Sequence, residues 1–286
     1  IAVKLGYLKA NGVVRKIWDF VNRLILRHAS RVIALSESMN EVVVRKAEHN
    51  GRIDTRKFRV IHNWVDEDFV RPIRKSENWF AAQHDLQDKF VVLYSGNIGL
   101  SHDLETVIAA ADKLRDKNIV FLFIGEGGKR RKLQALASQY RLQNVRFLSY
   151  QPREVLPYSL TCSDVSLVAL ERGIEGLSMP SKLYTILASG RPVVALVEPD
   201  SEVAQIISNV DCGKRVTQND VDALVRILDH YYTNKELVDR QGKNGRKYFE
   251  EHLNEVTDIL EEGRVYCSQI AKETLEEVKL AMGLSK

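Results

Sequence analysis

Short, almost wholly apolar runs alternate with amphipathic segments through the middle of this chain. The clearest runs are FVVLY at 90–94, IVFLFI at 119–124, VSLVAL at 165–170 and PVVAL at 192–196. Strands that are apolar on both faces must be covered on both faces, and neighbouring parallel strands need a helical crossover between them. The alternation therefore predicts an α/β fold, a doubly wound, Rossmann-like domain built on a parallel sheet.

Ligands of such sheets bind beyond the carboxyl ends of the strands. The loops expected there are 96–99 (GNIG), 125–128 (GEGG) and the loop that begins at Tyr150. Glycine permits a phosphate to approach the backbone closely, although it equally serves tight turns. GNIG lacks the GxGxxG spacing and no Walker lysine follows GEGG, which disfavours nicotinamide and P-loop chemistry.

The segment 173–194 (GIEGLSMPSKLYTILASGRPVV) combines an acid, a turn and a short apolar helix. Pro180 and Ser181 predict the helix start, since proline suits the first turn and a serine oxygen accepts a free backbone N–H. Gly190 suits the position after the helix. Lys182 opposes the helix dipole, so either an anion binds beside it or it is a solvated surface lysine. For one lysine taken alone, the second interpretation is the commoner.

Residues 13–28 (VVRKIWDFVNRLILRH) predict an amphipathic helix with basic residues around its polar side. Such a helix packs against the protein's own core or rests on an anionic membrane surface, and the first use is the commoner. The polar stretch that runs to about Lys89 predicts a linker between two structural units.

Composition limits the class of protein. With 286 residues, 44% of them hydrophobic, the chain is expected to form one or two globular domains. A net charge of +4 is too small to indicate a nucleic-acid partner, and the histidines show no metal-ligand spacing. Three widely spaced cysteines and the lack of a long apolar run predict a cytoplasmic protein in a reducing compartment.

Several motifs, read in order, resemble the carboxyl-terminal portion of a GT-B glycosyltransferase. They are RVIALS at 31–36, VIHNWVD at 60–66, VVLYSGNI at 91–98, FIGEG at 123–127, NVRFLSY at 144–150 and MPSKLYTILASGRPVV at 179–194. More narrowly, they are similar to the retaining family 4 enzymes that build bacterial exopolysaccharide, capsule or O-antigen, in a branch with a Pro-Ser-Lys motif. The resemblance covers roughly residues 1 to 253.

This resemblance implies a division of the chain. Residues 1–72 would be the end of an acceptor-binding lobe with its linker, and residues 73–253 a nucleotide-sugar-binding Rossmann-like domain. Residues 254–286 would form a helical extension. Most of the first lobe, with its usual catalytic-side histidine, would then lie upstream of Ile1. The donor would be a nucleotide sugar, UDP-linked above all, with no metal and no other cofactor.

Three departures from the family pattern concern the site. The glutamate that grips the donor ribose falls on Thr185, and its upstream acidic partner falls on Leu177, which leaves Glu175 as the nearest acid. The basic residues that hold the donor diphosphate fall near Asn97 and at 101–102. The resemblance therefore assigns Lys182 the missing positive charge.

The resemblance implies the following site. Glu175, which would orient donor sugar hydroxyls, and Lys182 would be catalytic. The donor would be held by Gly96, Asn97, Gly99, Gly125, Gly127, Tyr150, Ser181, Lys182 and Thr185.

The expected activity is sugar transfer, with retention of configuration, from the donor to a glycan or lipid-linked acceptor in cell-surface polysaccharide synthesis. Peripheral contact of residues 13–28 with the inner face of the plasma membrane would suit a lipid-linked acceptor. Two alternatives stay open: a non-catalytic nucleotide-sugar-binding fragment or subunit, and a sugar-nucleotide 2-epimerase on the same architecture.

Overall fold

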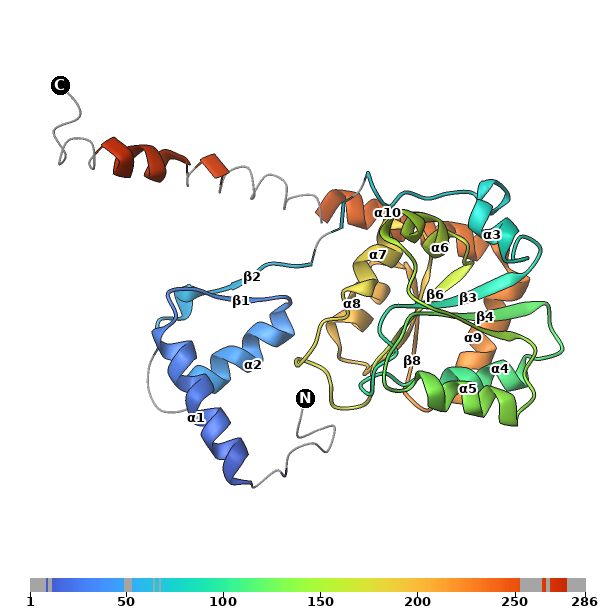
Figure 1. Cartoon of the computed structure of the whole chain (residues 1–286), viewed down its shortest axis with the longest axis horizontal. Helices are drawn as coiled ribbons and strands as arrows, with labels where there is room; N and C mark the ends of the chain where they lie inside the picture. The colour runs from blue at the N-terminus through green and yellow to red at the C-terminus, as the bar shows by residue number, and fades with distance from the viewer. Residues whose placement is uncertain are drawn as a thin grey trace.

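The computed structural model describes residues 9, 12–48, 53–63, 65–66, 68–252, 264–265 and 268–276. The first of its two units is a small βαβ arrangement preceded by a helix (Figure 1). Its elements are α1 (Val13–His28), β1 (Val32–Ala34), α2 (Glu37–Glu48), η1 (Thr55–Lys57) and β2 (Phe58–Val60).

The second unit begins with two short helical turns and then alternates strands with helices. Its first half contains η2 (Lys75–Glu77), α3 (Trp79–Gln83), β3 (Phe90–Ser95), α4 (Glu105–Lys113), β4 (Ile119–Ile124), α5 (Arg130–Gln139) and β5 (Val145–Leu148). Its second half contains η3 (Arg153–Val155), α6 (Leu156–Thr161), β6 (Val165–Ala169), α7 (Lys182–Ala188), β7 (Val193–Leu196), α8 (Glu202–Val210), β8 (Gly213–Val216), α9 (Val221–Thr233) and α10 (Lys235–His252).

These strands form one parallel sheet in the order β5-β4-β3-β6-β7-β8. The chain starts in the middle at β3, moves outward to β5, and returns to place β6 on the other side of β3. This is the doubly wound order of Rossmann-like folds, so the predicted fold class is confirmed. The order reverses between β3 and β6, and ligands of such sheets bind at that point.

Helices cover both faces of the sheet, as the apolar strands require. One buried cluster joins the sheet to α3, α6, α7, α8 and the end of α10, and the other joins it to α4, α5, α9 and the start of α10 (Figure 1). Successive strand residues point to opposite faces, so Leu93 belongs to the first cluster and Tyr94 to the second. The helices after β3 and β6, α4 and α7, therefore lie on opposite faces.

The start of α7 differs from the prediction. Ser181 has helical backbone angles and its side chain caps no N–H, because the first turn already begins at Pro180, whose carbonyl accepts from Leu183. The predicted end is confirmed: Gly190 takes a left-handed φ of +66° directly after the helix. A side chain there would be strained, which is why glycine fits.

Helix α1 lies against α2, to which Asp19 is joined by an ion pair with Lys46 of 3.1 Å. None of its residues is buried. Its apolar side is open, with Trp18 63% and Ile17 58% exposed. The sequence favoured packing of this helix against the protein's own core. In the described residues, the apolar side of α1 is not packed in this way.

The segment after β2 joins the second unit well before β3. Val70 is fully buried there, and Arg246 of α10 donates to its carbonyl at 2.9 Å. Arg191 donates to the Ile73 carbonyl at 2.7 Å. Most of the predicted extension 254–286, at the other end of the chain, lies outside the described residues. The described parts of this extension, 264–265 and 268–276, are helical.

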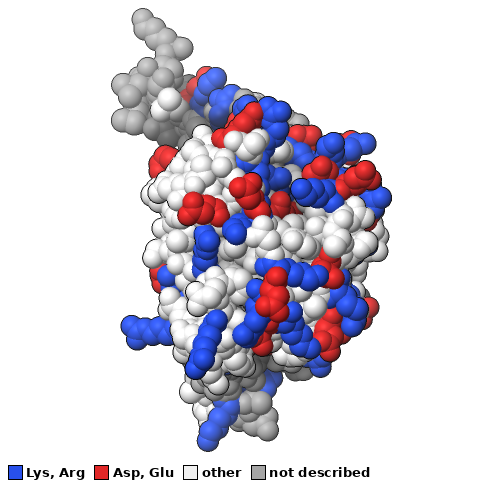
Figure 2. Space-filling model, turned by 90° about the vertical axis from the view of Figure 1, so that its right-hand side faces the viewer, with Lys and Arg blue, Asp and Glu red and all other residues white. Residues whose placement is uncertain are grey.

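Figure 2 shows lysines and arginines interspersed with aspartates and glutamates over the side of the molecule that lies to the right in Figure 1. Ion pairs join helices of the second unit, among them Lys113 with Asp222 at 2.5 Å and Lys132 with Glu105 at 2.8 Å. Exposed pairs of this kind contribute at most about 1 kcal/mol each. Opposite charges are thus mixed on this side.

Candidate functional site

A cavity of about 480 Å³ lies where the strand order reverses, beyond the carboxyl ends of β3 and β6. The loop after β3, the loop after β6, the first turn of α7 and the segment after β2 surround it. Its lining residues are Asn63, Val65, Ser95, Gly96, Asn97, Ser101, His102, Leu156, Leu160, Leu170, Ser178, Met179, Pro180, Ser181, Lys182 and Thr185.

Lys182 is the lysine that lines this cavity, and its amine is unusual because it is buried. Its Nζ atom is buried and has no hydrogen-bond partner in the described part of the chain. It lies 3.7 Å from the centre of the Tyr94 ring, and its side chain borders Gly96. Burial lowers the pKa of Lys182 to about 7. An ammonium held by a ring face alone, beside a cavity, is free to pair with an entering anion.

Lys129 shows what a compensated buried lysine looks like in the same region. Its Nζ donates to Glu105 at 2.8 Å, to Glu171 at 2.6 Å and to the His102 carbonyl at 2.7 Å. These bonds tie α4, the loop after β3 and the loop after β6 together. Lys129 is therefore a structural cation, and it leaves Lys182 as the cation that lines the cavity.

His102 was not among the predicted site residues, although the resemblance placed a basic residue near it. Its Nδ1 accepts from the Gly99 N–H at 3.1 Å, so the neutral ring carries its proton on Nε2. Burial, and then the charge of Lys182, lowers the pKa of His102 to about 4. The ring is thus a neutral donor that lines the cavity.

The predicted glycine loop offers fewer backbone donors than expected. The N–H groups of Gly96, Ile98 and Gly99 already donate to Ile124, Glu126 and His102. Within 96–99, only Asn97 keeps a backbone N–H without a partner in the described residues. Because the strand-end loops bond to each other, the Asn97 N–H is the backbone donor of this loop that stays open to a phosphate, and phosphate binding by the loop stays a prediction.

The structure brings five of the predicted residues to the cavity wall. They are Gly96, Asn97, Ser181, Lys182 and Thr185. The Thr185 hydroxyl donates to the Lys182 carbonyl at 2.9 Å.

The other predicted residues do not line this cavity. A Cβ at Gly125 would lie 2.0 Å from the Gly96 carbonyl oxygen, and one at Gly127 would lie 2.4 Å from that of Ile98. These glycines allow the two loops to pack together, and Gly99 and the exposed Tyr150 also lie outside the wall. Their predicted contacts with the donor stay predictions.

Glu175 lies toward the first unit. Its carboxylate accepts from the Glu202 N–H at 3.4 Å, and burial raises its pKa. The neighbouring Gly176 packs so closely on α2 that a Cβ there would lie 2.9 Å from Val42. The proposed role of Glu175 in orienting donor hydroxyls therefore stays a prediction.

A family model described as glycosyl transferases group 1 matches residues 75–248, which is more than half of the chain. The chain belongs to this glycosyltransferase family. The match covers most of the second unit and every lining residue of the cavity beside Lys182 except Asn63 and Val65.

Two curated relatives carry glycosyltransferase names. WcaI of Escherichia coli K12, named for colanic acid biosynthesis, is 42% identical over 197 residues, which are 68% of this chain and 47% of WcaI. WbjE of Pseudomonas aeruginosa is 27% identical over 227 residues, which are 79% of this chain and 56% of WbjE. The chain thus spans about half the length of the curated relatives it matches.

Solved structures show the same fold. HepE of Anabaena in complex with UDP gives a TM-score of 0.74 at 16% identity, over 91% of this chain and 70% of that one. Sucrose-phosphate synthase of Thermosynechococcus elongatus gives 0.72 at 20% identity, over 95% of this chain and 67% of that one. These neighbours confirm the GT-B type of architecture.

Two features are absent from the described residues. No helix there is long and apolar enough to cross a membrane. No three or more histidine, cysteine, aspartate or glutamate residues in that part gather as metal ligands do.

Removing the Lys182 charge should stabilise the glycosyltransferase. In the fold its pKa is about 7, against 10.5 in the unfolded chain. Between these values the unfolded chain holds a proton that the fold does not, so stability rises with pH across this window. We expect Lys182→Met to raise the free energy of unfolding by about 1–3 kcal/mol at pH 6–7.

Urea denaturation of both proteins at several pH values measures this gain, which should shrink as pH approaches 10. The exposed Lys243, replaced by methionine, is the control, and it should change stability by less than about 0.5 kcal/mol. A Lys182→Met protein less stable than the parent at pH 6 would show that the amine is stabilised by contacts that this account omits.

Proposed function

We propose that this chain binds the diphosphate of a UDP-sugar in the cavity beside Lys182, and that the whole protein transfers the sugar to a glycan or lipid-linked acceptor. Transfer would retain the anomeric configuration, as the resemblance to family 4 enzymes implies. The observation that carries the proposal is the buried Lys182 amine at the reversal point of the sheet, which has no hydrogen-bond partner among the described residues. HepE, a structural neighbour, has been solved with UDP and with UDP-glucose, which supports the choice of nucleotide.

The chemistry of the reaction explains why such an amine would be useful. The leaving group is a nucleoside diphosphate, and negative charge grows on its oxygens as the glycosidic bond breaks. The diphosphate of the bound donor is already anionic, and a preorganised ammonium in a site with little water stabilises the larger charge of the departing diphosphate more than that of the bound donor. Lys182 would supply this charge, and the Asn97 N–H would add a neutral donor.

The start of α7 contributes less than the sequence suggested. Leu183 and Tyr184 already donate their N–H groups to Pro180 and Ser181, and the helix is only 7 residues long. The positive end of a short helix, with part of its donors occupied, is a weak anion site. The proposal therefore depends on the lysine, and we propose that the ammonium acts in place of a metal ion.

His102 would orient the donor. Its Nδ1 is engaged by Gly99, so its Nε2–H is the group available to a phosphate or hydroxyl oxygen of the donor. Its pKa of about 4 keeps the ring neutral at physiological pH. A neutral donor holds the substrate without adding a second charge, which separates its role from that of Lys182.

We also propose that α1 contacts the membrane that carries a lipid-linked acceptor. Its open apolar side is flanked by Arg15, Lys16, Arg23 and Arg27 on the same helix. Apolar residues that enter the headgroup region, next to cations that face anionic lipids, are the features of an interfacial helix.

Loss of Lys182 should weaken donor binding while leaving the fold intact. A charge-assisted hydrogen bond contributes about 1.5–3 kcal/mol, so we expect UDP to bind Lys182→Met at least about 10-fold more weakly. Isothermal titration calorimetry at pH 6.5 measures this, with Lys243→Met as the control. Equal UDP affinity in the parent and in Lys182→Met would exclude Lys182 as the diphosphate ligand.

The membrane contact is tested by cosedimentation with vesicles that contain phosphatidylglycerol. Replacing Ile17 and Trp18 with serine removes two side chains that are 58% and 63% exposed, and should abolish binding. Tyr140→Ser, at an exposed aromatic residue on the second unit, should bind as the parent does. Undiminished binding of the Ile17→Ser/Trp18→Ser protein would rule out α1 as the contact.

A further inference from the structure

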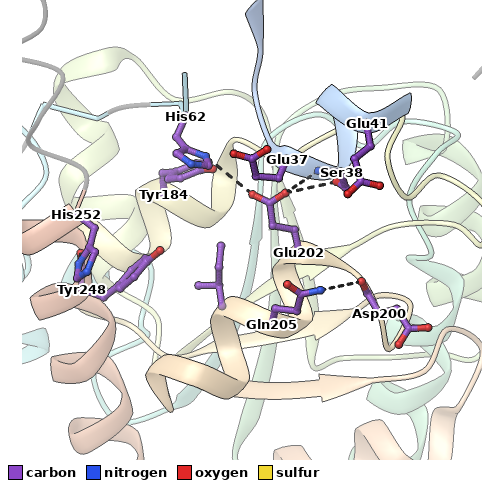
Figure 3. Close-up of a pocket in the computed structure, with 11 residues that line it drawn as sticks. Glu37, Ser38, Glu41, His62, Tyr184, Asp200, Glu202, Gln205, Tyr248 and His252 are labelled. Atoms are coloured by element: carbon purple, nitrogen blue, oxygen red, sulfur yellow. Dashed lines mark hydrogen bonds and ion pairs between the residues drawn. The ribbon is translucent and has the colours of Figure 1, made fainter. Parts of the chain in front are cut away.

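A second cavity, of about 640 Å³, lies between the two units (Figure 3). Side chains from α2 line one wall and side chains from the start of α8 line the opposite wall, with α7 and α10 at the side. Its lining residues are Glu37, Ser38, Glu41, His62, Tyr184, Asp200, Glu202, Gln205, Ile206, Tyr248 and His252. The donor chemistry proposed above uses none of these side chains.

The cavity is strongly acidic. Four carboxylates line it, from Glu37, Glu41, Asp200 and Glu202, and no lysine or arginine is among its lining residues. This contrasts with the net charge of +4 of the whole chain. Glu175 adds a further half-buried carboxylate behind Glu202, whose N–H it accepts at 3.4 Å.

Two of these carboxylates, both on exposed residues, have no partner in the part of the protein that the structure describes. Glu202 accepts from the N–H and hydroxyl of Ser38 at 3.4 Å, and Glu41 pairs with Arg45 of its own helix at 3.1 Å. In the part of the chain that the structure describes, the side chains of Glu37 and Asp200 form no ion pair or hydrogen bond. They are the groups that an entering cation would neutralise.

Tyr184 provides an independent sign of a ligand. Its side chain is 98% buried, since only 2% is exposed, and yet its hydroxyl has no hydrogen-bond partner in the described residues. Buried hydroxyls are nearly always paired, so an orphan hydroxyl in a cavity wall marks a place where a polar partner is missing. Figure 3 places Tyr184 beside His62, on the same cavity as the carboxylates.

The walls favour an organic cation over a metal ion. No group of metal ligands was found in the described residues, and the carboxylates are spread around a space far larger than an ion. Ile206 and Tyr248 add apolar surface, and His252 stacks on Tyr248 with ring centres 4.6 Å apart. A ligand that fills this space would carry N–H donors on a partly apolar body.

We propose that this cavity binds an organic amine, an amino sugar or a polyamine, whose ammonium group pairs with the carboxylate of Glu37 on α2 or with that of Asp200 beside α8. The Tyr184 hydroxyl would bond to the same ligand. The cavity adjoins the donor cavity, because His62 lines the first and Asn63 the second. The inference does not depend on the proposed diphosphate site.

Calorimetric titration of the 286-residue chain at physiological ionic strength tests the proposal, with glucosamine and spermidine as probes and N-acetylglucosamine as the uncharged control. We expect one saturable site for at least one amine and none for N-acetylglucosamine. The amine that binds identifies the source of the ammonium group as amino sugar or polyamine.

Three variants locate the site. Glu37→Gln/Asp200→Asn should bind the amine at least about 10-fold more weakly, and Tyr184→Phe about 3-fold or more, because each removes a group that the ligand needs. Asp116→Asn/Glu154→Gln, which removes two exposed carboxylates elsewhere, should bind as the parent does. UDP titrated into the same variants reports the donor site separately.

Three results would overturn the proposal. They are no saturable binding of either amine, equal binding by Glu37→Gln/Asp200→Asn and the parent, and binding of N-acetylglucosamine as tight as that of glucosamine. A failure of UDP to bind, with amine binding intact, would contradict the proposed function alone.

Discussion

Strands β3 and β6 are neighbours, but the helices that follow them, α4 and α7, lie on opposite faces of the sheet. Lys182 lies at the opening between the two strand ends. The strand order creates this opening without any help from the side chains. The close contact between the loops after β3 and β4 then shapes its rim, because glycine at 125 and 127 lets the backbones meet. The position of the site is thus a property of the topology, and its chemistry depends on the few side chains that enter it.

The two buried lysines near this opening differ in their partners, and we assign a structural role to one and a binding role to the other. Lys129 is surrounded by two carboxylates and a carbonyl, and it holds three segments together. Lys182 has the face of Tyr94 and, among the residues that the structure describes, no anionic partner. A buried charge without a partner is costly to the fold. An anionic ligand, such as the diphosphate that we propose, would supply the missing partner.

Much of the fold could be predicted from the sequence. The strand at 119–124 has the predicted limits, and the apolar runs at 90–94, 165–170 and 192–196 each match a strand to within one residue, because these runs end abruptly at polar or glycine residues. The end of α7 at Gly190 could be predicted for a similarly local reason. The cap by Ser181 could not, since the turn begins earlier and places serine inside it.

The site depends on contacts between segments that are distant in the sequence, and such contacts could not be predicted from local patterns. No local sequence pattern shows that the Gly96 N–H donates to the Ile124 carbonyl, or that the Gly99 N–H donates to the His102 ring. Likewise, Glu175 turns toward α8 because of residues 27 positions away in the chain. The acidic cavity has residues from five separate segments, so no motif could reveal it.

The number of protons taken up when UDP binds tests most directly whether Lys182 holds the diphosphate. At pH 8, Lys182, with a pKa of about 7, is mostly neutral in the free protein, and a bound diphosphate should restore its charge. Calorimetry in buffers of different ionisation enthalpy should show uptake of close to one proton by the parent. Lys182→Met, in conditions where it still binds, should take up none. UDP binding without proton uptake by the parent would contradict the account.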